Sequence, residues 1–193
     1  MNVVIIDYGV GNIKSIQFAF ERLGTSAILS QDVQTILAAD KIILPGVGEA
    51  SSAMRKLKAT QLDQLIPKLT QPVLGICLGM QLMCNYSEEG KTNGLKIFDT
   101  QVKRFSNAVK VPQMGWNTIT NLKTKLFNTI NANEYMYLVH SYYAESCSDA
   151  IAFTEYDLKY ASALNKDNFY GVQFHPEKSG TAGEQLLKNF LQL

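Results

Sequence analysis

The stretch Val73-Leu-Gly-Ile-Cys-Leu-Gly-Met-Gln-Leu82 joins a short apolar run directly to a segment of helical character. Within it, Gly75-Ile-Cys-Leu-Gly79 follows the G-x-S-x-G pattern of a nucleophile elbow, with cysteine in place of serine. Such an elbow is a tight, strained turn from a strand to a helix, and only small residues fit beside it. The stretch therefore predicts an α/β fold in which a strand over 73–77 leads into a helix that begins at Leu78.

The alternation of strand and helix extends from this stretch to the N-terminus. Short β-rich runs predict strands over residues 2–7, 26–29 and 41–44, and helical spacing predicts helices over 13–23 and 50–69, the second interrupted at Pro67. After Gly94 short strands dominate, at 102–105, 117–120, 135–139, 151–155, 160–164 and 169–174. We also expect a short helix over 123–130 and a last helix over 181–191, opened by a capping box at Thr181–Glu184. Continuous apolar strands that alternate with helices indicate a parallel sheet covered on both faces. We therefore predict one α/β domain over residues 1–193, with a mixed, mostly parallel sheet flanked by helices.

Composition excludes several classes of protein. The 193 residues are 46% hydrophobic and 18% charged, which is ordinary for a globular domain. The formal net charge of +1 argues against a nucleic-acid binder or a basic membrane patch. No apolar run approaches the roughly 20 residues that span a bilayer, and no secretory signal is visible. The three cysteines form no CxxC pair, which favours a reducing, cytoplasmic compartment.

Cys77 is the candidate nucleophile. The helix that starts behind it favours the thiolate form, and the backbone N–H of Leu78 lies where an oxyanion would form. The alternative is a cysteine packed in a core strand, which is common for this residue type. Two flanking glycines at a strand end favour the first interpretation.

A thiolate nucleophile needs a base, and the chain has two histidines. His175 precedes Pro176 and Glu177, and proline disfavours the helical region for the residue before it, so this stretch is expected to be extended or a turn. In an extended segment side chains two apart face the same way, so Glu177 can orient His175 toward Cys77. The predicted triad is Cys77, His175 and Glu177. His140 competes as the base but has no carboxylate at matching spacing, so we expect a structural or substrate-contacting role for it.

Two glycine-rich turns follow predicted strands. Pro45-Gly-Val-Gly48 opens at the strand ends where ligands gather, and its backbone can approach a substrate or supply a second oxyanion donor. Gly9-Val-Gly11 has Lys14 where a dinucleotide fingerprint needs glycine, so we exclude that function. No cluster of residues has zinc-like spacing. We expect no metal and no cofactor.

Taken together, these motifs resemble those of the class I glutamine amidotransferases. GICLGMQ and FHPE are typical of the whole family. The DYGVGN start, LPGVG, PQMGWN, VHSYY and YGVQFHPEKSG are similar to the glutaminase subunits of imidazole glycerol phosphate synthases, over essentially the full chain.

The resemblance implies a glutaminase that works with a partner. Cys77 would attack the side-chain amide of glutamine, His175 would transfer the proton and Glu177 would hold the ring. Val47 and Leu78 would form the oxyanion hole. Ammonia would pass to a cyclase subunit with a (β/α)8-barrel fold, which makes imidazole glycerol phosphate and an aminoimidazole carboxamide ribotide in histidine biosynthesis. The implied glutamine-binding positions are Gly46, Gly48, Gln81, Glu89, Ser141 and Tyr142, and the implied partner interface is Asn12, Gln113, Trp116, Asn117 and Lys178.

Two positions depart from the family pattern. Gln113 replaces the histidine of the common PHMGWN run, and Ala50 stands where many members have phenylalanine. Three other functions remain open at this point: a glutaminase serving another synthase, such as one that amidates a nucleotide-linked sugar, a catalytically silent binding domain, and a stand-alone cysteine hydrolase.

Overall fold

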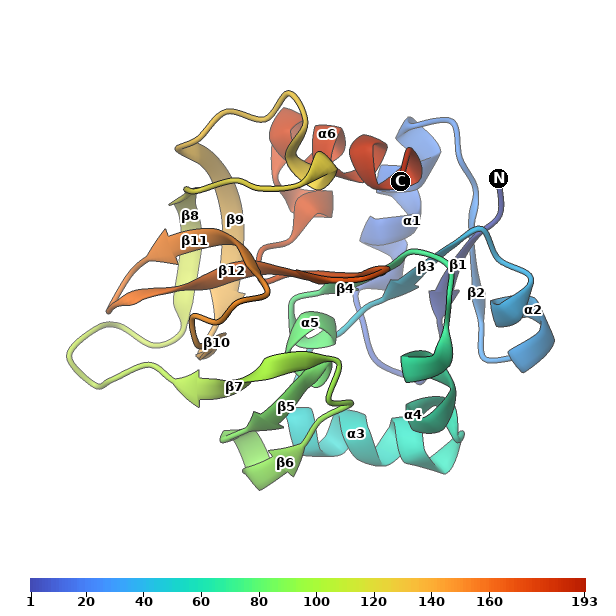
Figure 1. Cartoon of the computed structure of the whole chain (residues 1–193), viewed down its shortest axis with the longest axis horizontal. Helices are drawn as coiled ribbons and strands as arrows, with labels where there is room; N and C mark the ends of the chain where they lie inside the picture. The colour runs from blue at the N-terminus through green and yellow to red at the C-terminus, as the bar shows by residue number, and fades with distance from the viewer.

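The computed structural model describes residues 1–193, and a parallel sheet forms its centre (Figure 1). Five neighbouring parallel strands, in spatial order, are β2 (Ala27–Ser30), β1 (Val3–Ile6), β3 (Lys41–Leu44), β4 (Val73–Ile76) and β13 (Phe169–Val172). Alternate residues of β1 pack on opposite faces, Val4 and Ile6 in one hydrophobic cluster and Val3 and Ile5 in the other. Burial on both faces explains why these strands read as continuous apolar runs.

The sheet continues beyond β13 with strands of mixed direction. In spatial order these are β12 (Lys159–Lys166), β10 (Tyr142–Ala144), β7 (Phe98–Arg104), β5 (Cys84–Ser87) and β6 (Thr92–Asn93), while β11 (Ala150–Glu155) pairs with β12. The β13–β12, β12–β10, β10–β7 and β5–β6 pairs are antiparallel, and β5–β7 is parallel. This mixed α/β sheet confirms the predicted fold class.

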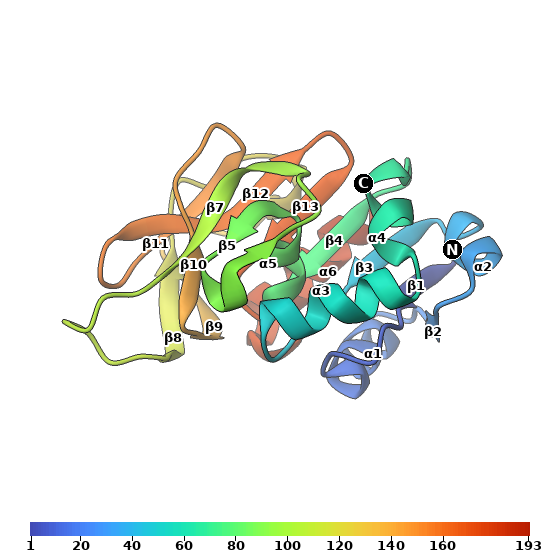
Figure 2. The same cartoon turned by 90° about the horizontal axis from the view of Figure 1, so that it is seen from below.

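Helices cover both faces of the sheet, as Figures 1 and 2 show from two directions. The helices α1 (Ile13–Arg22) and α6 (Gly180–Leu191) lie on one face. On the other lie α3 (Ala50–Ala59), α4 (Leu62–Leu65) and the short α5 (Leu78–Leu82), which follows β4 directly. A short helix, α2 (Val33–Leu37), sits near the β2 edge.

A separate antiparallel pair, β8 (Gln113–Ile119) and β9 (Glu134–His140), stands beside the main sheet. The sequence predicted strands at both places but did not separate them from the main sheet. Their seven-residue register runs from Gln113 opposite His140 to Ile119 opposite Glu134. This ladder brings His140, at the end of β9, next to the main sheet, because β10 follows after one residue.

Three predictions about helices are only partly correct. The segment 50–69 is broken at Gln61, whose φ of 58° ends α3, and Pro67 lies in a 3-10 turn at Ile66–Lys68. Residues 123–130 form only a 3-10 turn, Lys125–Phe127, between residues with positive φ. The capping box at Thr181–Glu184 does not form, because α6 begins one residue earlier, after Ser179, and no side chain caps it. The hydroxyl of Ser179 instead donates to the backbone oxygen of His175 at 2.6 Å.

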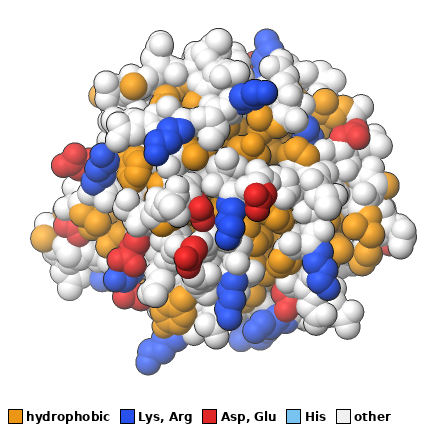
Figure 3. All heavy atoms as spheres, viewed as in Figure 1, with side chains coloured by type: hydrophobic (Ala, Val, Ile, Leu, Met, Phe, Trp, Pro, Cys, Tyr) orange, Lys and Arg blue, Asp and Glu red, His pale blue; other side chains and the backbone are white.

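None of the helices combines the length and apolarity that crossing a bilayer requires. Figure 3 shows charged side chains of both signs scattered over one face of the molecule, in keeping with the net charge of +1.

Candidate active site

Cys77 has the backbone of a nucleophile elbow. It stands between β4 and α5 with φ 53° and ψ −111°, a conformation that L-residues adopt only under strain. A side chain at Gly75 would meet Met83 and the backbone of Gly79, and one at Gly79 would meet the carbonyl of Leu44. Both glycines are therefore required by close packing, as the sequence pattern predicted.

His175 and Glu177 come together at the end of β13. His175 Nδ1 and Glu177 Oε1 are 2.8 Å apart and both side chains are buried. Of the two conformations expected there, His175 itself is extended, while Pro176–Lys178 is a 3-10 turn, so the pairing does not arise from the alternation of an extended segment. The backbone of His175 is fixed from two sides, by its N–H to the Tyr137 carbonyl at 2.9 Å and by the Ser179 hydroxyl.

Electrostatics around His175 favour its protonated form. Burial alone lowers the pKa of the ring, but hydrogen bonds with Cys77 and Glu177 and the negative charges of both outweigh it and raise the pKa to about 10. A protonated imidazole next to a sulfur stabilises a thiolate. The arrangement is thus able to deliver a nucleophilic sulfur and to return a proton to a leaving group.

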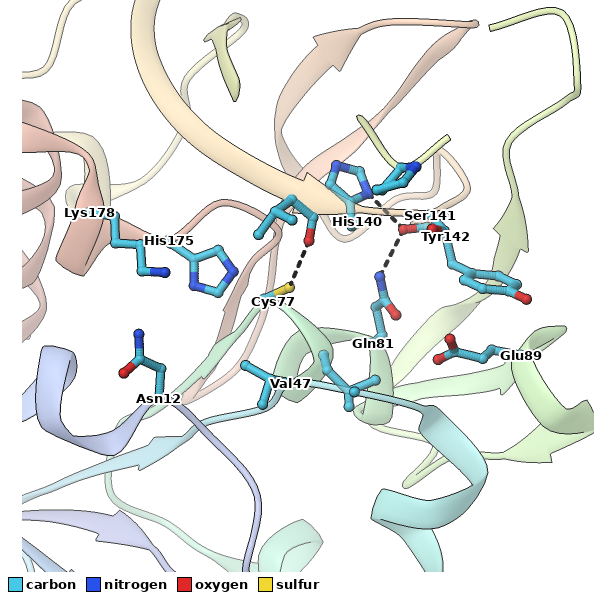
Figure 4. A pocket seen from close by; sticks show the side chains of 14 residues that line it. Asn12, Val47, Cys77, Gln81, Glu89, His140, Ser141, Tyr142, His175 and Lys178 are labelled. Carbon is cyan, nitrogen blue, oxygen red and sulfur yellow. Dashed lines mark hydrogen bonds between the residues drawn. The ribbon is translucent and has the colours of Figure 1, made fainter. Parts of the chain in front are cut away.

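Cys77 and His175 open into a cavity of about 390 Å³, within the usual size range of small-molecule sites. In Figure 4 Cys77 and His175 lie near its middle, with Asn12 and Lys178 together at one end and Glu89 and Tyr142 at the other. The cavity is lined by 14 residues: Asn12, Val47, Gly48, Cys77, Leu78, Gln81, Glu89, Pro112, Val139, His140, Ser141, Tyr142, His175 and Lys178.

Gln81 and Glu89 present oxygen atoms to this cavity. The Gln81 amide nitrogen donates to the Tyr142 backbone oxygen and to Gln173 Oε1, each at 2.8 Å, so both of its protons are used. One oxygen of Glu89 accepts the first N–H of α3, that of Ala50, at 2.8 Å. Burial raises the pKa of Glu89, partly offset by that bond. The remaining oxygens of Gln81 and Glu89 are acceptors for a cationic group.

The Pro45–Gly48 turn borders the cavity beside the elbow. A side chain at Gly46 would meet Gly79 N and Leu78, which explains the glycine there. The Tyr8 hydroxyl donates to the Pro45 backbone oxygen and ties the turn to the loop after β1. Val47, Gly48 and Leu78 all line the cavity.

His140 lines the same cavity but is engaged elsewhere. Its Nδ1 donates to the Tyr142 backbone oxygen at 2.8 Å, and its Nε2 lies 3.2 Å from the Tyr160 hydroxyl. Burial lowers the pKa of His140 to about 4, so the ring is neutral at pH 7. Held by these contacts, the neutral His140 ring forms part of the cavity wall, and His175 is the histidine that is paired with a carboxylate.

The predicted interface residues fall into two groups, one that lines the cavity (Asn12 and Lys178) and one on β8 (Gln113, Trp116 and Asn117). Asn12 and Lys178 lie at the cavity mouth, and Asn12, at the start of α1, makes no capping bond with its side chain. Trp116 is 54% exposed and packs edge-on against Tyr137 of β9, while Asn117 donates to the Glu155 carbonyl. Gln113 is buried, and its oxygen accepts from the Tyr160 hydroxyl at 2.9 Å.

Sequence reasoning missed Gln173, which is completely buried and contacts Cys77. The only available signal was its place two residues before His175, at the end of a predicted strand, where alternation aims both side chains to one side. No group of three or more His, Cys, Asp or Glu side chains is arranged to hold a metal ion.

Comparisons with known proteins agree with this geometry. Residues 4–193 match the family described as Glutamine amidotransferase class-I. The chain is 53% identical to the imidazole glycerol phosphate synthase subunit HisH of Bacteroides fragilis, over all of both chains, and 46% identical to that of Haemophilus influenzae, over all of this chain and 98% of the relative. Two solved glutamine amidotransferases share the fold. One has a TM-score of 0.77 at 16% identity, covering 98% of this chain and 97% of the other, and one from Thermotoga maritima has 0.65 at 20%, covering 100% and 83%. The chain therefore belongs to the class I glutamine amidotransferases and, within them, to the group of HisH subunits.

Proposed function

We propose that this chain is the glutaminase subunit of an imidazole glycerol phosphate synthase, and that Cys77, His175 and Glu177 carry the reaction. The observation that carries the proposal is the elbow cysteine beside a buried histidine–carboxylate pair in a cavity that also offers acceptors for a substrate cation. The names of the relatives, over the full chain, support the synthase assignment.

The reaction runs through a covalent intermediate. The Cys77 sulfur attacks the side-chain amide carbon of glutamine, the C–N bond breaks, and His175 gives its proton to the departing nitrogen, which leaves as ammonia. Water then attacks the thioester carbon and gives a proton to His175, the C–S bond breaks, and glutamate leaves the Cys77 thiolate beside protonated His175. Glu177 keeps the ring oriented and stabilises its positive charge throughout, as the carboxylate of a catalytic triad does.

The negative oxygen of the tetrahedral intermediate needs donors. The N–H of Leu78, at the start of α5, has no partner inside the helix and stands next to the sulfur. We assign the second donor to the Val47 backbone, in the turn that borders the cavity. Gly46 and Gly48 let this turn approach the substrate closely.

Glutamine itself is recognised along the cavity. Its α-ammonium group is placed against the oxygens of Gln81 and Glu89, the two acceptors left unfilled there. Ser141 and Tyr142 form the wall beside them. This position leaves the amide end of glutamine at Cys77, toward the middle of the cavity (Figure 4).

Ammonia is passed to a cyclase subunit, for which we propose a (β/α)8-barrel. The interface comprises Asn12, Gln113, Trp116, Asn117 and Lys178, with Gln113 acting from inside because its side chain is buried. We place the complex in the cytoplasm and assign it no nucleic-acid or membrane partner, in keeping with the near-zero charge.

The test is glutamine hydrolysis by the purified chain alone and with the cyclase subunit and its ribotide ligand. We expect a low rate alone and a large rise in the complex, because ammonia made without an acceptor is lost. Cys77→Ser, which replaces the sulfur by a poor nucleophile, should abolish glutamate formation without loss of complex formation. High turnover by the isolated chain, with no further rise in the complex, would contradict the proposal and favour a stand-alone hydrolase.

A further inference from the structure

We propose that Gln173 is a further residue of the catalytic machinery: it stabilises the Cys77 sulfur through its amide N–H and at the same time fixes the amide of Gln81. Its action on the sulfur does not depend on which amide the enzyme hydrolyses. Its consequence for glutamine turnover rests on the function proposed above.

The side chain of Gln173 contacts two residues that line the cavity, Cys77 and Gln81. The side chain has no solvent exposure, its Nε2 lies 3.6 Å from the Cys77 sulfur, and its Oε1 accepts from Gln81 Nε2 at 2.8 Å. The residue follows β13 directly, and its backbone N–H donates to the Ser162 carbonyl of β12 at 2.9 Å. The two neighbouring strands therefore hold the amide in place.

The donors and acceptors around Gln81 and Gln173 determine which atom of the Gln173 amide faces Cys77. The Tyr142 backbone oxygen can only accept, so the group of Gln81 that faces it must be the NH2. The second proton of that NH2 needs an acceptor, which is Gln173 Oε1. The nitrogen of Gln173 is then the atom that faces Cys77. A flip of either amide would set two NH2 groups or two oxygens against each other inside the protein.

This orientation supplies a donor where the nucleophile carries charge. A donor stabilises the thiolate more than the thiol, and the effect is larger in a buried site than in water. The Val139 backbone carbonyl, 3.9 Å from the sulfur, is an acceptor and favours the thiol. Beside the positively charged His175, Gln173 is the neutral side-chain donor that contacts the sulfur, and it favours the thiolate without adding charge.

The experiment measures alkylation of Cys77 by iodoacetamide against pH in the intact chain without glutamine, with the adduct counted on the Cys77 peptide by mass spectrometry. Gln173→Met keeps the length of the side chain but removes the donor. We expect the midpoint of the pH profile to rise by about one unit, since a hydrogen bond to a charged group is worth about that much. Gln173→Glu keeps the acceptor for Gln81 but sets a carboxylate against the sulfur, so its midpoint should rise further.

Asn189→Leu is the matched control. Asn189 is also a buried amide, donates to two backbone oxygens, those of Leu126 and Asn128, and lies on α6 outside the cavity. Its variant should lose stability but keep the wild-type alkylation midpoint.

Folded Gln173→Met with the wild-type midpoint would overturn the proposal, and so would an unchanged midpoint in Gln173→Glu. Wild-type protein offers a readout that needs no variant. The side-chain amide NMR signals of Gln173 should shift with the same pH midpoint as the alkylation rate, and signals that stay constant would equally refute the contact. A chain that alkylates as expected but does not hydrolyse glutamine would retain this inference and lose the proposed function.

Discussion

The two histidines of the chain are both buried, and their surroundings move their pKa values in opposite directions. His175 faces Cys77 and Glu177, whose hydrogen bonds and charges more than offset its burial and raise its pKa to about 10. His140 meets a carbonyl and a phenol, has no counter-charge, and its burial lowers its pKa to about 4. One ring is therefore charged and able to take part in proton transfer, while the other is a neutral wall residue.

The depressed pKa of His140 predicts a pH-dependent stability. Between pH 6.5 and about 4 the unfolded chain binds a proton at this residue that the folded chain does not, so the free energy of unfolding should fall as pH falls through this window. One proton gives a slope of at most about 1.4 kcal/mol per pH unit. Urea unfolding of wild type and His140→Gln from pH 4.5 to 7 measures it. The variant should be the less stable at pH 7, and the gap should close toward pH 4.5; a gap that stays constant would show that His140 does not titrate on unfolding.

Glu177 is a buried carboxylate whose negative charge stabilises the protonated His175 ring. Its Oε1 accepts from His175 Nδ1, while its buried Oε2 has no hydrogen-bond partner. Glu177→Gln keeps the shape and an acceptor for the ring but removes the charge that stabilises the protonated ring. In complex with the cyclase, we expect kcat for glutamine hydrolysis to fall by about 100-fold or more with little change in KM, because the charge matters most when the ring is protonated in the transition state. A comparable loss in KM alone would mean that Glu177 serves substrate binding instead.

At the scale of elements, local chemistry decided which parts of the fold were predictable. The elbow could be recognised because its two glycines and its cysteine each meet a constraint within a few residues. The continuous apolar strands were equally recognisable, since burial on both faces leaves Lys41, at the start of β3, as the one polar residue in β1 and β3. The helix α2 and the strands β5, β6 and β10, which were not predicted, are five residues or shorter, and contacts with their neighbours in space stabilise them.

In the candidate site, likewise, contacts between residues close in the sequence could be predicted, and contacts between distant residues could not. His175 and Glu177 are two residues apart, so their pairing could be expected from sequence, although a 3-10 turn and not an extended strand produces it. Gln173 and Gln81 meet across 92 positions, and only the register of β13 beside β4 brings them together. The burial of Gln113 depends likewise on Tyr160, a residue 47 positions away.

Gly79 should be the elbow glycine that is least tolerant of substitution, because α5 approaches β3 closely at this residue. A Cβ at Gly79 would fall on the carbonyl of Leu44, a backbone atom that cannot move without shifting β3. Gly79→Ala should cost about 3 kcal/mol or more of unfolding free energy and reduce Cys77 alkylation. Gly24→Ala is the control, because Gly24 has open space around it and only its φ of 71° to strain, worth about 1 to 2 kcal/mol. Equal losses in the two variants would mean that the elbow tolerates a wider turn than the packing indicates.

At the scale of the whole molecule, the cavity mouth and the β8–β9 ladder form one side of the protein. Asn12 and Lys178 stand at the mouth, and Lys178 Nζ lies 5.9 Å from the ring centre of Tyr137 on β9. On β8 the alternate side chains Met114 and Trp116 point outward, with exposed fractions of 65% and 54%. Large apolar side chains so exposed, next to the candidate site, fit a surface that a partner covers.

This surface yields the prediction that tests the proposed complex most directly. Trp116→Ala removes a large exposed ring whose only aromatic neighbour is Tyr137, so the chain should fold as before. We expect its affinity for the cyclase subunit to fall by about 30-fold, the equivalent of about 2 kcal/mol for a central aromatic side chain. Leu37→Ala on α2 is the matched control: Leu37 is 51% exposed, and α2 lies at the opposite end of the sheet (Figure 1). Titration calorimetry with the cyclase measures both affinities, and iodoacetamide measures whether Cys77 is unchanged. If Trp116→Ala binds as tightly as Leu37→Ala, the partner docks elsewhere. If instead it binds weakly but reaches full glutaminase activity at saturating cyclase, Trp116 contributes affinity and the activating contact belongs to the residues at the cavity mouth.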